Sequence, residues 1–198
     1  MYNVPANLPF ESTTAEFIDT GIHENVKLDS VEYGKATNEF IAFNFKGSNG
    51  EKLVWTQWKP GGNDPEKVTE KELNQMSRIK QLCMCFVPKE KFVFQSNTFE
   101  EFARKIISIL GDSYIGVDLR VKVVYSGNYT SLPNYWKFRF VERMDNNGYL
   151  GDEVKKSKIK ILSIDKMTRP VSDPIPSVTN PFAEAGFTAP VLTNESPF

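Results

Sequence analysis

The 198-residue chain has few of the residue types that catalytic and metal sites need, with two cysteines and one histidine. Cys83 and Cys85 lie in an apolar segment where nothing supplies further ligands, so neither a zinc site nor a disulfide is expected. His23, beside Gly21 ahead of a strand-like run, is interpreted as a turn or cap residue rather than a general base. There is no nucleophile motif and no readable pair of carboxylates. We therefore expect no enzyme activity, no cofactor and no metal.

Long apolar runs are also missing. No run approaches the length that spans a bilayer, and the N-terminus has no cationic start followed by an apolar stretch. These absences favour a soluble protein of the cytoplasm. The formal net charge is -1, from 24 Lys and Arg against 25 Asp and Glu. Such a balance argues against a protein that coats duplex DNA by bulk charge, so any contact with nucleic acid must come from a local basic stripe.

Aromatic residues are plentiful, at 13% of the chain with 15 Phe, and are expected to build much of a core. Residues 1–20, which contain Pro5 and Pro9, are predicted to form an N-terminal arm. Residues 21–167 carry regular hydrophobic periodicity and are predicted to fold as one domain. Residues 168–198 hold six of the twelve prolines and little aliphatic periodicity, so they are predicted to form a flexible tail.

Alternating apolar and polar residues, the period-two pattern of β-strands, recur along this domain. Between the third and fourth such run the apolar period becomes helical, over residues 66–86 and 99–110. Three strands, a helical insert and a hairpin are the chain order of the OB-fold. We predict a mainly β fold with a helical insert (α+β), an OB-fold-like antiparallel barrel of five to six strands with two helices between strands three and four. A different closed barrel, or an open sheet packed by two helices, is the alternative. The predicted strands are residues 25–33, 39–46, 51–59, 119–125, 135–140 and 158–164.

The predicted hairpin of residues 119–140 has two different faces. Apolar residues alternate in both of its strands with residues that are basic or aromatic. One face is expected to be buried, and the other to present Lys and Arg around Tyr135. Polar outward faces are common on antiparallel sheets and can simply keep an edge soluble, so a purely structural interpretation stays open. The residues assigned to the core are Leu119, Val121, Val123, Trp136, Phe138 and Phe140.

The third predicted strand, residues 51–59, repeats this arrangement. Leu53 and Trp55 share one face, while Trp58 lies on the other with basic and polar neighbours. A basic surface with aromatic rings suits single-stranded nucleic acid, because Lys and Arg follow phosphates and flat rings stack on bases of any sequence. If Trp58 faces the core instead, its loss would lower stability rather than binding. The candidate nucleic-acid-binding residues are Lys52, Thr56, Trp58, Arg120, Lys122, Tyr135, Lys137 and Arg139.

The end of the chain provides separate evidence. Residues 168–198 contain three acidic residues against one arginine, and the last four residues are Glu195, Ser196, Pro197 and Phe198. This ending resembles the tails of single-stranded DNA-binding proteins of bacteria and their phages, in which an acidic segment ending in Pro-Phe docks on replication and repair partners. Pro197 and Phe198 carry the match, with Glu195 as a single acidic neighbour where the family usually has several in a row. The resemblance implies that Pro197 and Phe198 bind partner proteins.

The body of the chain, from Gly21 through residues 25–28 and onward to the predicted hairpin, is also similar to single-stranded DNA-binding proteins encoded by tailed phages. The resemblance implies sequence-nonspecific binding and protection of single-stranded DNA in replication and recombination, in the cytoplasm of the host cell. It also implies that the tail recruits replication or recombination proteins. The rival interpretation is a non-catalytic virion-associated or protein-interaction module with an OB-like barrel, whose outward rings form a protein interface.

Overall fold

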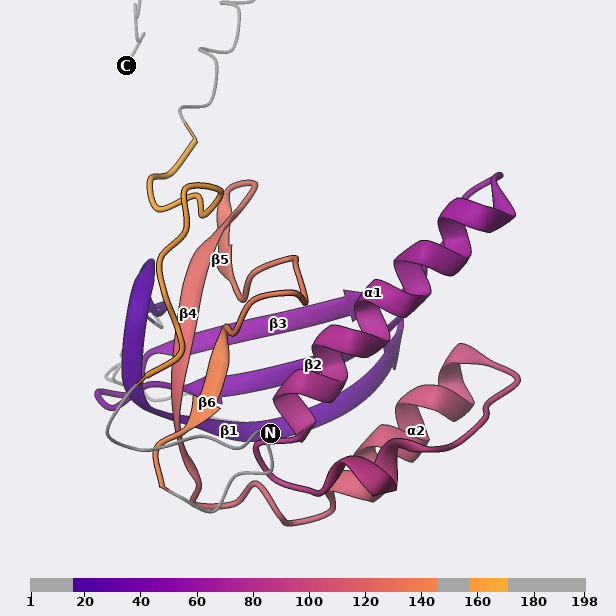
Figure 1. Ribbon diagram of the computed structural model, residues 1–198, viewed down its shortest axis with the longest axis horizontal. Coiled ribbons are helices and arrows are strands. Elements are labelled where there is room, and N and C mark those ends of the chain that lie inside the picture. The colour runs from indigo at the N-terminus through magenta and orange to yellow at the C-terminus, as the bar shows by residue number, and fades with distance from the viewer. Residues whose placement is uncertain (1–15, 146–156, 171–198) are drawn as a thin grey trace, which may run out of the picture.

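The computed structural model describes residues 16–145 and 157–170. Most of the predicted N-terminal arm lies outside these residues, and so does nearly all of the predicted tail, including Pro197 and Phe198. The described residues form an antiparallel sheet, two α-helices and one short 3-10 helix (Figure 1). No helix in these two stretches is long and apolar enough to cross a membrane.

The sheet follows the strand order β3-β2-β1-β4-β5. β5 and β6 lie end to end along one edge of β4, because β5 pairs with residues 124–126 and β6 with residues 119–121. β3 and β5 approach each other, but in the described part of the chain they do not pair, so the curved sheet is open along a seam between them (Figure 1). The strands are β1 (Gly21–Lys35), β2 (Glu39–Lys46), β3 (Lys52–Trp58), β4 (Asp118–Ser126), β5 (Tyr129–Ser131) and β6 (Val141–Arg143).

β1 connects the two halves of the sheet, since it pairs with both β2 and β4. Its register shifts between Leu28 and Ser30 against β2, and between His23 and Val26 against β4. An extra residue in one strand bends it and increases its twist, which lets one long strand serve two neighbours. The sequence alternation changes phase at Ser30, where the structure has the first of these irregularities.

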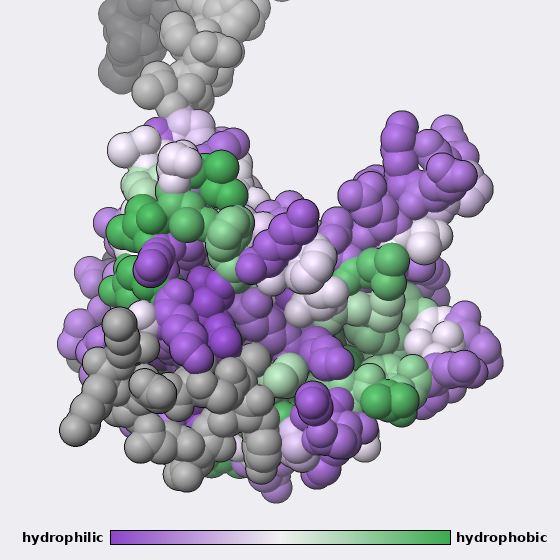
Figure 2. Space-filling view, in the orientation of Figure 1, coloured by the Kyte–Doolittle hydropathy of each residue, from purple (hydrophilic) through white to green (hydrophobic). Residues whose placement is uncertain are grey.

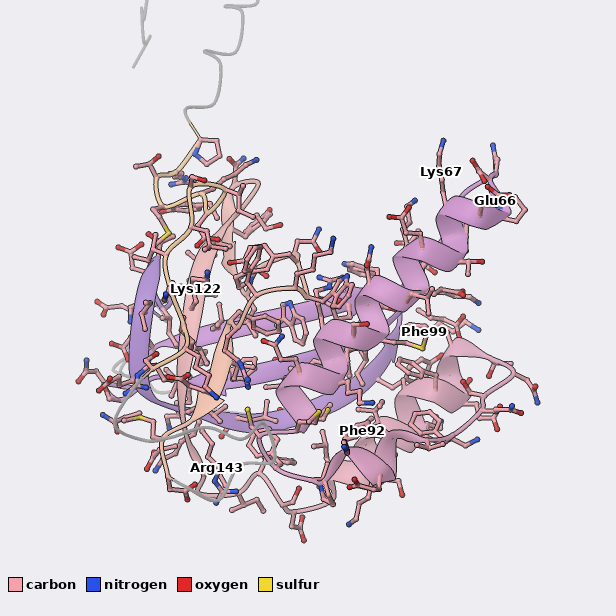
Figure 3. All side chains as sticks on the ribbon, viewed as in Figure 1. Glu66, Lys67, Phe92, Phe99, Lys122 and Arg143 are labelled. Carbon is pink, nitrogen blue, oxygen red and sulfur yellow. The ribbon has the colours of Figure 1, made fainter. Side chains whose placement is uncertain are left out.

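Two capped helices lie between β3 and β4 along the chain. α1 (Pro65–Cys83) begins after Asp64, whose carboxylate accepts the N–H groups of Glu66 at 3.1 Å and Lys67 at 3.4 Å. α2 (Phe99–Leu110) begins after Thr98, whose hydroxyl accepts the N–H of Glu101 at 3.1 Å. The short 3-10 helix η1 (Lys89–Phe92) joins them. The outer end of α1, where Glu66 and Lys67 lie, projects away from the sheet (Figure 3).

The core lies between the sheet and the inner faces of both helices. Trp55 is at its centre, 1% exposed, with ring-centroid distances of 5.2 Å to Phe43 and 5.9 Å to Phe140. Burial of these large rings is the main apolar contribution to stability in this part of the fold. The other residues that are no more than 2% exposed include Leu28, Phe45, Leu53, Ile79, Leu82, Ile106, Leu110, Leu119, Val121 and Val123.

Two of the predicted strands are wrong. Residues 135–140 form no strand. Gln81 on α1 is the partner of several of their backbone groups: its amide nitrogen donates to the Trp136 carbonyl at 3.2 Å, and its amide oxygen accepts the Phe140 N–H at 3.0 Å. The Phe140 carbonyl accepts a backbone N–H of β4, that of Lys122 at 2.8 Å. The assignment of Trp136 and Phe138 to the core is also wrong, since they are 43% and 48% exposed. Residues 158–164 have no ladder either, and lie as an irregular segment instead.

Candidate nucleic-acid interface

In the described part of the chain β3 is an edge strand, because no strand of the sheet pairs with its side away from β2. The Lys52 N–H donates to the Glu16 carbonyl at 2.8 Å, and the Lys52 carbonyl accepts the Ile18 N–H at 3.0 Å. Both bonds lie on the side of β3 away from β2. Backbone groups alternate in direction along an antiparallel strand, so those of residues 54, 56 and 58 also face the open edge. Near the end of the strand, the Gln75 amide donates to the Trp58 carbonyl at 2.7 Å. The edge of β3 therefore forms one wall of the seam.

A groove follows this seam. One hollow of about 640 Å³ lies between the outer face of β3 and the hairpin of β4 and β5, and another of about 390 Å³ continues it toward α1. In Figure 1 the hairpin and α1 rise on either side of β3. We call the two hollows together the seam groove. The two hollows share Thr56, Trp58, Ser126 and Ser131 in their linings.

Exposed aromatic rings line the seam groove. Trp58 is 49% exposed, Phe17 66% and Tyr129 79%. Phe40 supports Trp58 from beneath, with ring centroids 4.9 Å apart and planes tilted by 56°. A ring that is braced on one side and open on the other offers a flat surface for stacking without further ordering cost.

The charges of the seam groove have one sign. Lys59, Lys71, Arg78 and Arg169 line it, and no Asp or Glu is among its described lining residues. Burial lowers the pKa of the Arg78 guanidinium to about 10, which still leaves it charged at neutral pH. Lys71 donates to the Gly61 carbonyl at 3.1 Å, and only Lys59 has a described carboxylate partner, at 2.6 Å from Glu39.

The predicted site residues of β3 lie together on its outer face. Thr56 and Trp58 line the seam groove, while Lys52 is exposed at the start of the same strand. The separation of faces predicted for this strand is confirmed, because Trp55 is 1% exposed and Trp58 is 49% exposed. The alternation placed the two rings on opposite faces, and the structure shows which of them is buried.

The outward exposure predicted for Lys122 is wrong, because its side chain has no exposed surface. Its ammonium donates to Asp165 at 2.8 Å and to the Lys160 carbonyl at 2.6 Å. Tyr135 is drawn into the same network, since its hydroxyl donates to Asp165 at 2.7 Å. Lys122 also lies 5.0 Å from the Tyr135 ring centroid. Figure 3 shows Lys122 on β4, beside the segment that follows residue 156.

The Asp165 carboxylate is held in its charged form. Burial alone would raise its pKa, but hydrogen bonds from Lys122, Tyr135 and the Leu162 N–H outweigh burial and keep the pKa below its usual value. Burial and the bond to Asp165 raise the pKa of the Tyr135 hydroxyl. These groups form a closed structural network, and we assign neither Lys122 nor Tyr135 to a nucleic-acid surface.

Arg120 is also used within the fold. Its guanidinium pairs with Glu142, and at 2.8 Å with Glu24. The side chain of Glu142 is only 3% exposed. Burial would raise the pKa of Glu142, but hydrogen bonds from Ser157, Arg120 and the Lys158 N–H lower it. The charge of Arg120 is thus balanced by two carboxylates and is not directed to solvent.

Lys137 and Arg139 lie outside the seam groove. They line a separate hollow of about 310 Å³ against the C-terminal half of α1, together with Lys80 and Phe138. The structure therefore divides the predicted residues among the face of β3, the buried network, the Arg120 pairs and this hollow.

Several residues of the seam groove were missed by sequence reasoning. Lys71, Gln75 and Arg78 recur at the spacing of one helix face, a signal that the sequence contains. Tyr129 follows Gly127, a turn residue with a φ of 64°. Arg169 belongs to a stretch without periodicity, so no local pattern predicted its place.

Among the described residues, no group of three or more His, Cys, Asp or Glu side chains could hold a metal ion. Cys83 is buried with a free thiol, and burial raises the pKa of that thiol well above its usual value. No known protein-family model and no curated protein matches the sequence.

Proposed function

We propose that the protein binds single-stranded DNA with little base preference, and that the seam groove is the site. The observation that carries this proposal is the lining of the groove, which combines four cations and three exposed rings with no described carboxylate. The chain as a whole has slightly more acidic than basic residues, so the segregation is local. Phosphates are attracted to such cations, and unpaired bases stack on such rings.

We further propose that the sheet is an OB-fold opened between its third and fifth strands. The support is the chain order, a three-stranded meander, helices and then a hairpin, with β1 between β2 and β4. OB-folds bind oligonucleotides on the face of strands two and three and in the adjoining loops. The seam groove includes that face of β3 and Asn128 of the turn between β4 and β5.

In the proposed mechanism the bases stack on Trp58 and Tyr129, while Lys71 and Arg169 lie along the phosphates. Duplex DNA binds more weakly because its bases are already stacked on one another. Binding protects the strand by mass action and needs no nucleotide hydrolysis. The biological role that fits this activity is replication or recombination of a phage genome in the host cytoplasm, with Pro197 and Phe198 recruiting partner proteins.

The test is a titration of a labelled oligo-dT with the full chain at several salt concentrations. Trp58→Ala is expected to weaken binding by about 1 to 3 kcal/mol, the usual cost of losing one stacked base. Ile115→Ala is the control, because Ile115 is 66% exposed and lies outside the groove. With the four groove cations engaged, log affinity is expected to fall with log salt with a slope of about -3. A flat salt response, or equal affinity of both variants, would contradict the proposal.

A second candidate function, a protein-interaction module, has one observation in its favour. A hollow of about 580 Å³ between α1 and α2 is lined by Met76, Phe94, Phe99 and Phe102, and Figure 2 shows hydrophobic residues gathered beside these helices. Exposed apolar surfaces of this kind often bind other proteins. This function would be favoured if the titration shows no binding of oligonucleotides at low salt.

A further inference from the structure

We infer that the bound strand continues beyond the seam groove, across residues 132–140, into the hollow that contains Lys80 and Lys137. This inference rests on the proposed function and adds to it a second part of the site, formed by the C-terminal part of α1 together with residues 137–139. We call this second part the helix hollow. The candidate nucleic-acid-binding residues predicted from the sequence include none from either helix, so this role for α1 comes from the structure.

The helix hollow repeats the chemistry of the seam groove. Lys80, Lys137 and Arg139 surround it, and Phe138 offers a ring that is 48% exposed. No Asp or Glu is among the described residues that line it. No described carboxylate forms an ion pair with Lys80 or Lys137, so both ammonium groups are available for phosphates.

α1 lines both parts of the path. Lys71 and Arg78 face the seam groove, whereas Lys80 and Met84 face the helix hollow. At about 100° per residue Lys80 lies about 160° around the helix from Arg78, and Gln81, which also lines the hollow, lies between them at about 60° from Arg78. Residues 132–140 pass over α1 between the seam groove and the helix hollow, and we call this segment the crossing. A nucleic acid strand that leaves the groove at Arg78 would pass over the crossing and then enter the hollow.

The crossing is held in place by side chains of α1. Arg78 donates to the side chain of Asn134 at the groove end. Gln81 donates to the carbonyls of Trp136 at 3.2 Å and Phe138 at 3.4 Å, and its own oxygen accepts the Phe140 N–H. The ring of Trp136 is 43% exposed on this crossing. Two exposed rings thus follow each other between the groove and the hollow.

These features favour a nucleic acid strand over an acidic peptide as the occupant. Both would be attracted by the cations, but a peptide of carboxylates has no flat groups to place on Trp136 and Phe138. Every nucleotide supplies one phosphate and one π-face, which is the pairing that the path offers. Residues 132–140 also link the two parts, since Asn134 lines the seam groove while Lys137 and Phe138 line the helix hollow.

The test is a length series of oligo-dT from about 4 to about 20 nucleotides, titrated with the full chain. The double variant Lys80→Gln/Lys137→Gln is expected to bind the shortest oligonucleotides like the unaltered protein and the longest ones more weakly. Its salt slope on the longest ones should be smaller by about 1.4, because two phosphate contacts are lost. Phe138→Ala should weaken binding of the longest ones by at least about 5-fold. The charge-matched control is Lys89→Gln/Lys91→Gln, in two exposed residues of η1.

The outcomes are distinct, provided that each variant melts like the unaltered protein. If the unaltered protein binds no oligonucleotide, the proposed function and this inference both fail. If it binds, but the Lys80/Lys137 variant equals the control at every length, the seam groove stands and the helix hollow fails. The helix hollow also fails if the variant loses affinity equally at all lengths, or if oligo-glutamate of matched charge displaces the longest oligonucleotide while the Phe138 variant binds it normally.

Discussion

Replacing Lys122 by methionine tests whether the buried network holds the fold together. The ammonium and the Asp165 carboxylate are 2.8 Å apart, and neither side chain has any exposed surface. Methionine keeps most of the length and apolar volume of lysine but removes its charge. The variant leaves Asp165 buried with only Tyr135 and the Leu162 N–H as donors, and leaves the Lys160 carbonyl without its ammonium partner.

The expected loss is large. Removing one partner of a buried ion pair costs about 3 to 5 kcal/mol, because the other charge stays desolvated. Domains of this kind have unfolding free energies of about 5 to 15 kcal/mol, so the variant should be folded but clearly weakened. The measurement is urea unfolding at pH 7, with the free energy of unfolding and the m-value taken from the same curve.

An exposed ion pair provides the control. Lys27 lies 3.7 Å from Asp118, with the two side chains 53% and 45% exposed. Lys27→Met is expected to cost less than about 1 kcal/mol, as exposed pairs do. A loss below about 1 kcal/mol for Lys122→Met as well, at an unchanged m-value, would refute the reasoning that burial sets the strength of this pair.

The network also predicts a pH dependence. The folded-state pKa of Asp165 is below its usual value, so its carboxylate stabilises the fold above pH of about 4 and loses that contribution as the pH falls through the folded pKa. The double variant Lys122→Met/Asp165→Asn removes both charges and should be more stable than the sum of the single losses implies. Its stability should also change less between pH 6 and pH 3 than that of the unaltered protein; equal acid sensitivity would show that Asp165 is not the titrating group.

Three further predictions concern the core, the ion pairs of Arg120 and the end of the chain. Trp55→Ala should lower the free energy of unfolding by about 3 to 5 kcal/mol, measured by urea unfolding, and an unchanged curve would contradict its central place in the core. Arg120→Met should cost about 1.5 to 3 kcal/mol in the same assay, since Glu142 loses a charged donor. Deleting residues 191–198 should leave the melting temperature nearly unchanged and the DNA affinity equal or slightly higher, because Glu195 and the terminal carboxylate repel phosphate; a lower melting temperature would contradict this.

The period-two alternation of the sequence predicted the two faces of a strand where one face lies in the core and the other is open to solvent. β3 is the clearest case, because its inner face is buried in the core and its outer face borders the seam groove. Trp55 and Trp58 lie on opposite faces as the alternation indicates, but the alternation left open which of them is buried. The bounds of α2 follow equally well, since Thr98 and Glu101 act locally at its start and Gly111 ends it. Local interactions decide such features, so local sequence predicts them.

The same alternation failed at residues 135–140 for a reason that lies elsewhere in the chain. A strand needs a neighbour for its backbone groups, and here Gln81 on α1 supplies that partner. Pro133 also removes one N–H just before the segment. The rings of Trp136 and Phe138 alternate with cations as in a half-buried strand. The alternation cannot reveal that a helix side chain has replaced the ladder.

Lys122 shows a second limit of the pattern. Alternation correctly separates its side chain from Val121 and Val123, which belong to the apolar core. It does not say what covers the other face, and residues 157–170 cover it at this point. That segment was predicted to form a strand at residues 158–164, whereas it covers Lys122 through tertiary contacts such as those of Asp165 and the Lys160 carbonyl.

The buried network nevertheless affects the seam groove. Asp165 anchors the segment to β4, the Tyr125 N–H donates to the Lys166 carbonyl at 2.8 Å, and the Thr20 hydroxyl donates to the Met167 carbonyl at 2.8 Å. These contacts hold the chain two to four residues ahead of Arg169, which lines the groove. Lys122 therefore contributes to the basic lining indirectly, by positioning another cation. If the anchor loosens in Lys122→Met, the salt slope of oligonucleotide binding should fall by about 0.7, the share of one phosphate contact, although Lys122 itself never meets the strand.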